Sequence, residues 1–158
     1  SMSDRHELAY KKILKTVEYA VIATADASGK PWNSPVNHFI DRGGAVCWFS
    51  AKDAVHSENV RQSGKVFIVI FDSTLPPGSA EAVYIEAEAY EVTDRDELVR
   101  MLEDNDDDLK RRLAQVTGDG IHRYYKAIPK RTWVNDCELD ENGRYVKDIR
   151  IEVGKDEQ

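Results

Sequence analysis

Short runs of β-favouring residues, separated by tight-turn sequences, constrain the fold of this chain most strongly. The runs "YAVIATAD", "PWNSPVNHFID" and "AVCWFS" are joined by "DASGK" and "DRGG". Turns of this composition connect neighbouring antiparallel strands. The two prolines of the second run favour a sheet edge or a bulge over a regular central ladder. The first part of the chain therefore predicts a three-stranded antiparallel meander.

Further strands are predicted later in the chain. The apolar run "KVFIVIFDS" indicates a strand buried on both faces, and "VYIEAEAYEVTD" alternates with the period of a half-exposed strand. The segment "KRTWVNDCELDENGRYVKDIRIEV" predicts a hairpin that turns at residues 140–143. The sum is six or seven strands, most of them consecutive in sequence.

Helical patterns surround these strands. Residues 4–20 predict an amphipathic helix capped by Ser3 or Asp4. Its apolar face is formed by Leu8, Ile13, Leu14 and Val17. We also expect a short helix over residues 52–63 and helical structure over residues 94–126.

Few helices separate the strands, and this decides the fold class. We expect a mainly β fold, a Greek-key or meander β-barrel with peripheral helices, rather than a doubly wound parallel sheet. The sequence has no internal repeat and no long linker, so residues 1–158 are expected to form one domain. Ser1 and Met2 look like a cloning remnant, so the predicted fold does not depend on them.

The charge and composition of the chain argue against two classes of binding partner, nucleic acids and membranes. A net charge of −7 argues against a nucleic-acid-binding protein, although a local cationic pocket can still bind an anion. The sequence contains neither a membrane-length apolar stretch nor the apolar core of a signal peptide. Cys47 and Cys137 are therefore expected to be reduced packing thiols, and the protein to be cytoplasmic without a membrane partner.

No metal site is expected from the sequence. The histidines are dispersed and lack Cys or Asp neighbours at ligand spacing. They are His6, His38, His56 and His122. The acidic run "EDNDDD" lacks the glycine and the terminal glutamate of an EF-hand loop, so it favours a solvated helix cap over a calcium site. Since no acid–base set appears at a convincing spacing either, the catalytic residues stay unassigned.

The stretch "CWFSAKDAVHSENVRQSGKVFIVIF" combines an aromatic strand end with a polar helix start. A phosphate needs donors and a cation, and a helix N-terminus offers free N–H groups. With a helix starting near Lys52 or Asp53, Lys52 and His56 would project from one face, beside the strand that ends at Ser50. The alternative is a solvated helix face that follows ordinary core packing of Trp48 and Phe49.

The order of motifs over residues 21–72 resembles the pyridoxamine 5′-phosphate oxidase-like family of FMN-binding split β-barrels. The matching segments are "ATADASGKP", "WFS" and "SENVRQSGKVFIVIF", which occur in the family's order and spacing. They cover about a third of the chain. The resemblance implies a split barrel, bound FMN, and a homodimer with the flavin at the subunit interface.

The resemblance also implies a set of cofactor-binding residues. On the second strand these are Asn33, Ser34, Pro35, Val36 and Asn37. Trp48, Phe49 and Ser50 would line the flavin ring and the ribityl chain, and Lys52 and His56 would hold the phosphate. Trp133 corresponds to a tryptophan that often approaches the cofactor, although a barrel-capping aromatic is the alternative. His38 could donate a proton or could simply be a satisfied strand histidine.

Two departures from the family pattern limit what the resemblance implies. An Arg-Lys pair usually stands on the phosphate helix, where this chain has Val55 and His56. The substrate segments of the oxidases contain an Arg-x-His-x-Arg motif, whereas residues 148–152 read "DIRIE". The missing histidine and arginine argue against oxidation of pyridoxamine phosphate.

The resulting expectation is an FMN-dependent oxidoreductase that transfers hydride between a small-molecule substrate or a nicotinamide and the flavin. A flavin-binding sensor or storage protein without turnover is an alternative. A relative that binds haem or the deazaflavin F420 is another.

Overall fold

Seven antiparallel strands and four helices make up the part of the chain that the computed structural model describes, residues 2–103 and 108–154. The elements are α1 (Met2–Thr16), β1 (Tyr19–Ala25), β2 (Pro31–Ile40), β3 (Val46–Ala51), α2 (Val55–Ser63), β4 (Lys65–Phe71), β5 (Ala82–Glu91), α3 (Arg95–Leu102), α4 (Leu109–Gln115), β6 (His122–Leu139) and β7 (Tyr145–Val153). The mainly β class predicted from the sequence is confirmed.

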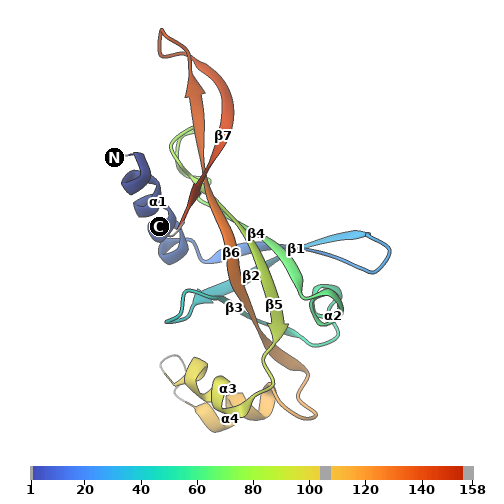
Figure 1. Cartoon of the computed structure of the whole chain (residues 1–158). Coiled ribbons are helices and arrows are strands. Elements are labelled where there is room, and N and C mark those ends of the chain that lie inside the picture. Colours follow the sequence, from blue (N-terminus) through green and yellow to red (C-terminus); the bar gives the residue numbers. More distant parts are fainter. Residues whose placement is uncertain (1, 104–107, 155–158) are drawn as a thin grey trace.

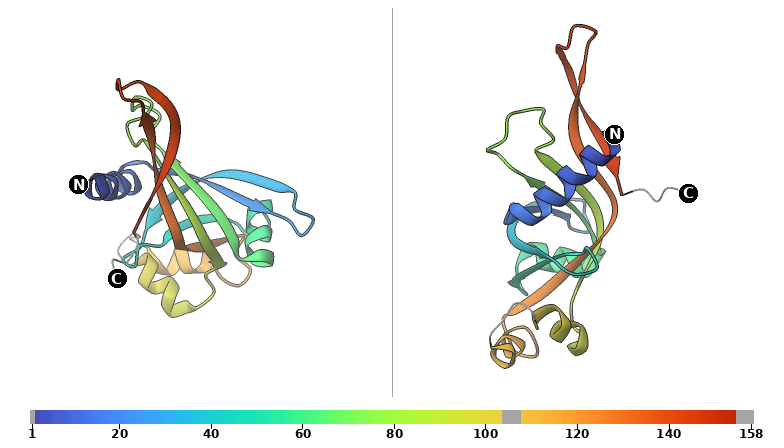
Figure 2. Two further views of the ribbon diagram at one scale, coloured as in Figure 1. Left: turned by 45° about the horizontal axis from the view of Figure 1, so that its top comes forward. Right: turned by 90° about the vertical axis from the view of Figure 1, so that its left-hand side faces the viewer.

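The sheet closes on itself through its longest strand. Its order is β3-β2-β1-β4-β5-β6-β7, with an additional pairing between β3 and β6 that closes the barrel. The first part of β6 pairs with β3, and its last part pairs with β7 in a hairpin that projects from the barrel (Figure 1). The structure is consistent with a split barrel, in which β1–β2 forms a second projecting hairpin that extends past α2 (Figure 2).

The inner face of the barrel forms the main core. Its fully buried side chains include Ile22, Trp48, Ile68, Ile85 and Tyr125. Helix α1 packs against the barrel and contributes Ile13 to this core (Figure 2). Each strand thus sends alternate side chains inward, as the period of a β-strand requires.

Helix α1 confirms one expected helix but corrects its apolar face. Ile13 is buried and Leu14 and Val17 pack partly against the core, whereas Leu8 is 69% exposed. The buried side of the helix begins instead at His6, seven residues before Ile13 and therefore on the same face. Position 8 lies on the opposite side, where a leucine faces water. The expected caps at Ser3 and Asp4 are also wrong, because the helix begins at Met2.

A second core lies between the barrel wall and helices α3 and α4. Cys47 and Tyr124 from the sheet pack there against Leu98, Leu102 and Leu113. The helical structure expected up to residue 126 is wrong at its end, because β6 begins at His122. Tyr124 enters the second core and Tyr125 enters the first, so both faces of the strand are buried here and the sequence shows no alternation of apolar and polar residues. The acidic run predicted as a helix cap spans residues 103–108, of which 104–107 lie outside the described residues.

Strand β4 is buried on one face rather than two. Val66, Ile68 and Ile70 point inward, whereas Phe67 and Val69 are half-buried on the outer face. This outer face of the sheet is apolar around Phe67 and Val69, whereas Lys65 and Glu86 add charge at one side of it, and it is not fully covered within the described chain.

Both cysteines are free thiols, as expected. Burial, together with the nearby Asp41 carboxylate, raises the pKa of Cys47 to about 12, so this thiol stays protonated. No helix within the described residues is long and apolar enough to cross a lipid bilayer.

Candidate functional site

The candidate site lies where strands β2 and β3 part from each other. These strands pair only from His38–Trp48 to Ile40–Val46, whereas β1 and β2 pair along their full shared length. Beyond the His38–Trp48 pair, residues 33–37 continue along β2 and residues 49–51 continue along β3 without pairing to each other. The two segments expected to contact a cofactor therefore flank the point at which the barrel wall splits.

The N-terminus of helix α2 faces this region without a side-chain cap. Its N-cap residue is Ala54, which makes no capping hydrogen bond, whereas Asp94 and Asp108 cap α3 and α4 with their carboxylates. The first N–H groups of a helix have no partner inside the helix, and the helix dipole gives them a partial positive charge. An uncapped start of this kind is suited to binding an anion.

Two side chains of the first turn of α2 join it to the end of β3. The Ser57 hydroxyl donates a hydrogen bond to the Ala51 carbonyl at 2.7 Å. The imidazole Nε2 of His56 lies 2.8 Å from the Ser50 hydroxyl. Burial lowers the pKa of His56, so the imidazole is mostly neutral near neutral pH. Two hydrogen bonds therefore join the start of α2 to β3, and the junction is rich in polar groups, but His56 adds no permanent charge to it.

Lys52 occupies the turn between β3 and α2 rather than the helix. The expectation that the helix starts near Lys52 is wrong, because α2 begins at Val55. The turn is fixed by two contacts to the Lys52 backbone: its N–H donates to the Ile121 carbonyl at 2.9 Å, and Arg61 donates to its carbonyl at 2.6 Å. Among the described residues, the Lys52 ammonium forms no ion pair or hydrogen bond.

The five candidate residues on β2 alternate between the two faces of the strand. Asn33, Pro35 and Asn37 are exposed, whereas Ser34 is half-buried and Val36 is buried. Asn33, Pro35 and Asn37 therefore present their side chains to solvent, and the other two do not. A ligand beside this strand would meet Ser34 and Val36 mainly through their backbone.

The three candidate residues on β3 also separate. Trp48 is fully buried and stacks on Tyr125, with ring centroids 5.9 Å apart. Phe49 points to the opposite face and stacks on His122 at 4.4 Å. Of the three side chains, the Ser50 hydroxyl is therefore the one that reaches the start of α2. His122 was not singled out from the sequence, because residues 122–126 were expected to be helical.

At the paired positions His38 and Trp48, two buried polar atoms find no hydrogen-bond partner among the described residues: the His38 Nδ1 and the Trp48 Nε1. Burial lowers the pKa of His38, although hydrogen bonds to the Leu14 and Glu18 carbonyls oppose this effect. His38 is thus a buried, mostly neutral imidazole at the last paired position before the strands part.

Trp133 lies away from this junction, on the outer face of the sheet. It pairs in register with Tyr84 and Glu152, stacks on Phe67 at 6.2 Å, and carries the Arg131 guanidinium over its ring at 4.8 Å. The structure therefore does not bring Trp133 together with Ser50, Lys52 and His56 within one chain.

Comparison with models of protein families identifies the family of this chain. The family model described as pyridoxamine 5′-phosphate oxidase matches residues 7–135, which is well over half of the chain. The chain belongs to the pyridoxamine 5′-phosphate oxidase family. Comparison with curated protein sequences finds no relative.

Solved structures of this fold include both haem-binding and flavin-binding proteins. HutZ, the haem storage protein of Vibrio cholerae, matches with a TM-score of 0.63 and 20% identity, over 82% of this chain and 94% of HutZ. An FAD-binding protein from Mesorhizobium loti matches with a TM-score of 0.58 and 15% identity, over 79% and 90%. A haem-binding protein from Mycobacterium smegmatis matches with a TM-score of 0.64 and 17% identity, over 94% of this chain but 57% of its own. At these identities the likeness shows the fold shared by this pyridoxamine 5′-phosphate oxidase family member, and it does not identify the cofactor.

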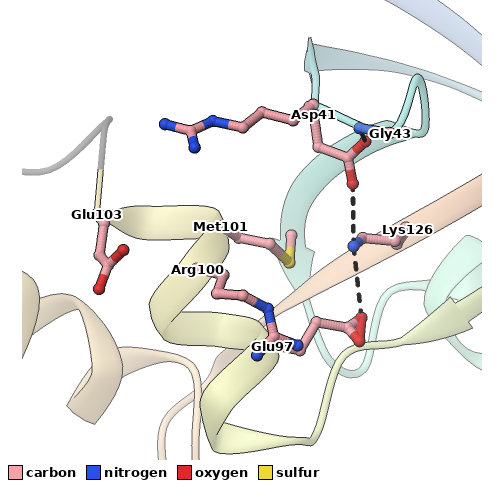
Figure 3. A pocket seen from close by; sticks show the side chains of 8 residues that line it. Asp41, Gly43, Glu97, Arg100, Met101, Glu103 and Lys126 are labelled. Carbon is pink, nitrogen blue, oxygen red and sulfur yellow. Dashed lines mark hydrogen bonds and ion pairs between the residues drawn. The ribbon is translucent and has the colours of Figure 1, made fainter.

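A separate cavity of about 400 Å³ lies on the α3 side of the barrel (Figure 3). The Lys126 ammonium points into it between two carboxylates, 3.0 Å from Asp41 and 3.6 Å from Glu97. Arg42 and Arg100 line the cavity as well, and the acidic residues Asp41, Glu97 and Glu103 balance the three basic ones, so the cavity has no net positive charge to attract an anion. Within the described residues there is no group of three His, Cys, Asp or Glu side chains that could hold a metal ion.

Proposed function

We propose that the protein binds FMN with the phosphate at the N-terminus of α2, and that it acts as an oxidoreductase. The observation that carries the proposal is the uncapped start of α2, which follows Lys52 in the turn and lies beside the contact between Ser50 and His56. A phosphate accepts several hydrogen bonds at once and gains from the helix dipole, so it fits this donor set.

The residues of the chain would divide the binding between them. Lys52 would supply the permanent charge, Ser50 and the first N–H groups of α2 would donate hydrogen bonds, and the β2 segment would border the ring. Bound FMN supplies the hydride-transfer chemistry, whereas the protein supplies orientation and shields the reaction from water. The electron donor and acceptor in this proposal are a nicotinamide and a small-molecule substrate.

The proposal includes a homodimer, argued from the outer face of the sheet. One row across β1, β4, β5 and β6 consists of Val21, Val69, Tyr84 and Trp133, all half-buried. Phe67 extends this apolar surface by stacking on Trp133. A sheet face of this composition gains stability when a second copy covers it. Trp133 would then reach the cofactor held by the partner subunit, which explains its distance from its own junction.

Haem is the second candidate cofactor, because two of the structural neighbours store or bind haem. F420, and a flavin-binding sensor or store without turnover, are further alternatives. We place the protein in the cytoplasm, because its two free thiols fit a reducing compartment.

The absorption spectrum of the purified protein, with mass spectrometry of the small molecule that co-purifies, tests this proposal. We expect a flavin spectrum and the mass of FMN, and reduction of the flavin by NADH or NADPH would separate an enzyme from a store. A Soret band would replace FMN by haem, and the mass of F420 would replace it by the deazaflavin.

A further inference from the structure

His56 is a titratable side chain placed where the phosphate is proposed to bind. Its imidazole is half-buried and lies 2.8 Å from the Ser50 hydroxyl. It belongs to the first turn of α2, where the partial positive charge of the helix end disfavours a second positive charge. In the protein without ligand, both burial and the helix end therefore hold His56 in its neutral form.

The other cations around the junction are committed to protein acceptors. Arg61 binds the Glu91 carboxylate at 3.1 Å and the Tyr125 hydroxyl at 3.0 Å, in addition to the Lys52 carbonyl. Arg123, which pairs with Ser50 across β3 and β6, donates three hydrogen bonds to the carbonyls of the 118–122 segment. Lys52 is thus the permanent cation that the described part of the junction leaves available.

Two acidic side chains stand beside the same helix start, Asp53 and Glu58, and both are exposed to solvent. They add negative charge near a bound phosphate, so a single lysine does not balance the local charge of a phosphate dianion. A second positive charge close to the phosphate would lower the energy of the complex. His56 is the side chain positioned to supply it.

Protonation of His56 requires no rearrangement of its surroundings. A hydroxyl group can donate to a neutral imidazole nitrogen or accept from a protonated one. The contact between Ser50 and His56 therefore survives in either protonation state. The phosphate dianion, in contrast, favours the imidazolium form, because opposite charges in contact stabilise each other.

We propose that loading of the phosphate-bearing cofactor takes up a proton at His56, which makes cofactor affinity depend on pH. This inference rests on the proposed function, since it requires the phosphate at the start of α2. Affinity rises as the pH falls from the pKa of His56 in the complex to its lower pKa in the free protein. Within that window, the change approaches about tenfold per pH unit for one linked proton.

Isothermal titration of the cofactor-free protein tests this inference. FMN is titrated from about pH 5.5 to pH 8.5, a range that spans the titration of histidine. At each pH, two buffers of different ionisation enthalpy give the number of protons taken up. Riboflavin, which lacks the phosphate, is the first control. The second control is His56→Gln, because FMN itself titrates near pH ~6 in both proteins and only the difference between them reports on His56.

We expect the wild-type protein to take up more protons per FMN than His56→Gln, and to lose affinity with rising pH more steeply. Equal proton uptake by the two proteins, with FMN still bound more tightly than riboflavin, would overturn the inference and leave the phosphate site intact. Equal affinity for FMN and riboflavin at every pH would overturn the phosphate site itself. The two failures are therefore distinguishable.

Discussion

At the scale of single residues, one side chain at the junction between β3 and α2 supplies the positive charge, and two others form a hydrogen bond. Lys52 supplies a charge that the described residues leave unpaired, whereas His56 and Ser50 bind each other. The sequence placed Lys52 and His56 on one helix face, but the structure puts them on a turn and on a helix. They can still serve one anion, because both border the same uncapped helix start.

The double variant Lys52→Ala with His56→Ala is expected to weaken FMN binding by about 2–4 kcal/mol, the scale of two charge-assisted contacts. Riboflavin binding should change little, because riboflavin carries no phosphate. Fluorescence titration of both ligands measures the effect. Lys147→Ala is the matched control, since Lys147 pairs with Glu138 on the distant hairpin. Unchanged FMN affinity in the double variant would refute the phosphate assignment.

Trp48 offers a second test at this scale, because its indole N–H is buried and has no hydrogen-bond partner in the part of the chain that the structure describes. Replacement by phenylalanine removes that unpaired donor, which offsets part of the cost of the lost ring volume. We expect Trp48→Phe to lower the free energy of unfolding by about 1 kcal/mol or less, far below the ~3–5 kcal/mol of a tryptophan-to-alanine change.

Tyr125→Phe is the comparison variant for Trp48→Phe. The Tyr125 hydroxyl accepts from Arg61 and contacts Glu91, so its removal breaks existing hydrogen bonds. Chemical denaturation should show a larger loss for Tyr125→Phe than for Trp48→Phe. The reverse order would mean that the indole N–H has a partner in solution, such as a buried water.

At the scale of elements, helix α1 is attached to the barrel by a buried polar contact. Asp136 on β6 lies 2.8 Å from both the fully buried His6 imidazole and the Arg5 guanidinium. Burial acts to raise the pKa of Asp136, but hydrogen bonds from His6 and the Cys137 N–H and the charge of Arg5 outweigh it, so the pKa is lowered.

A lowered carboxyl pKa gives a definite pH dependence. The stabilisation is fully present above the usual pKa of an aspartate and is lost as the pH falls through the lower pKa of Asp136 in the folded protein. At neutral pH, Asp136→Asn is expected to cost about 2–3 kcal/mol, the scale of hydrogen bonds to a charged group. Denaturation curves at neutral and acidic pH measure it. A cost that stays constant down to strongly acidic pH would contradict the account.

The sequence predicts some elements better than others, because some depend on local residues and others on contacts between distant segments. The hairpin turns were predictable because local residues dictate them. Gly29, Gly44 and Gly143, for example, adopt positive φ angles that suit glycine. The start of β6 was not predictable by alternation, since Tyr124 and Tyr125 are buried in different cores. Its strand character depends on pairing with β3 and β5, which lie far away in the sequence, so local residues do not reveal it.

The candidate site was also predictable only in part from the sequence. The order of motifs located the segments on β2 and β3 and the start of α2, because turns with recognisable sequences lie next to each of them. The direction of each side chain could not. Trp48 points into the barrel and Trp133 points out of it, and only the closed sheet defines those directions.

At the scale of the whole molecule, the apolar row on the outer face of the sheet leads us to expect a homodimer, and this expectation can be tested. We expect sedimentation equilibrium to show a dimer, and Trp133→Glu to shift it towards a folded monomer, because a buried carboxylate at an interface is costly. Leu8→Glu is the matched control, since Leu8 is 69% exposed on the far side of α1. A wild-type monomer, or a Trp133→Glu variant as dimeric as Leu8→Glu, would contradict the proposed interface.

The most direct test of the central claim is a crystal structure of the protein in complex with FMN. The account predicts the phosphate within hydrogen-bonding distance of the first N–H groups of α2 and close to Lys52. It also predicts that the flavin ring lies beside the segment of β2 that has parted from β3. A phosphate bound elsewhere, or a ring seated in the cavity beside Lys126, would contradict it.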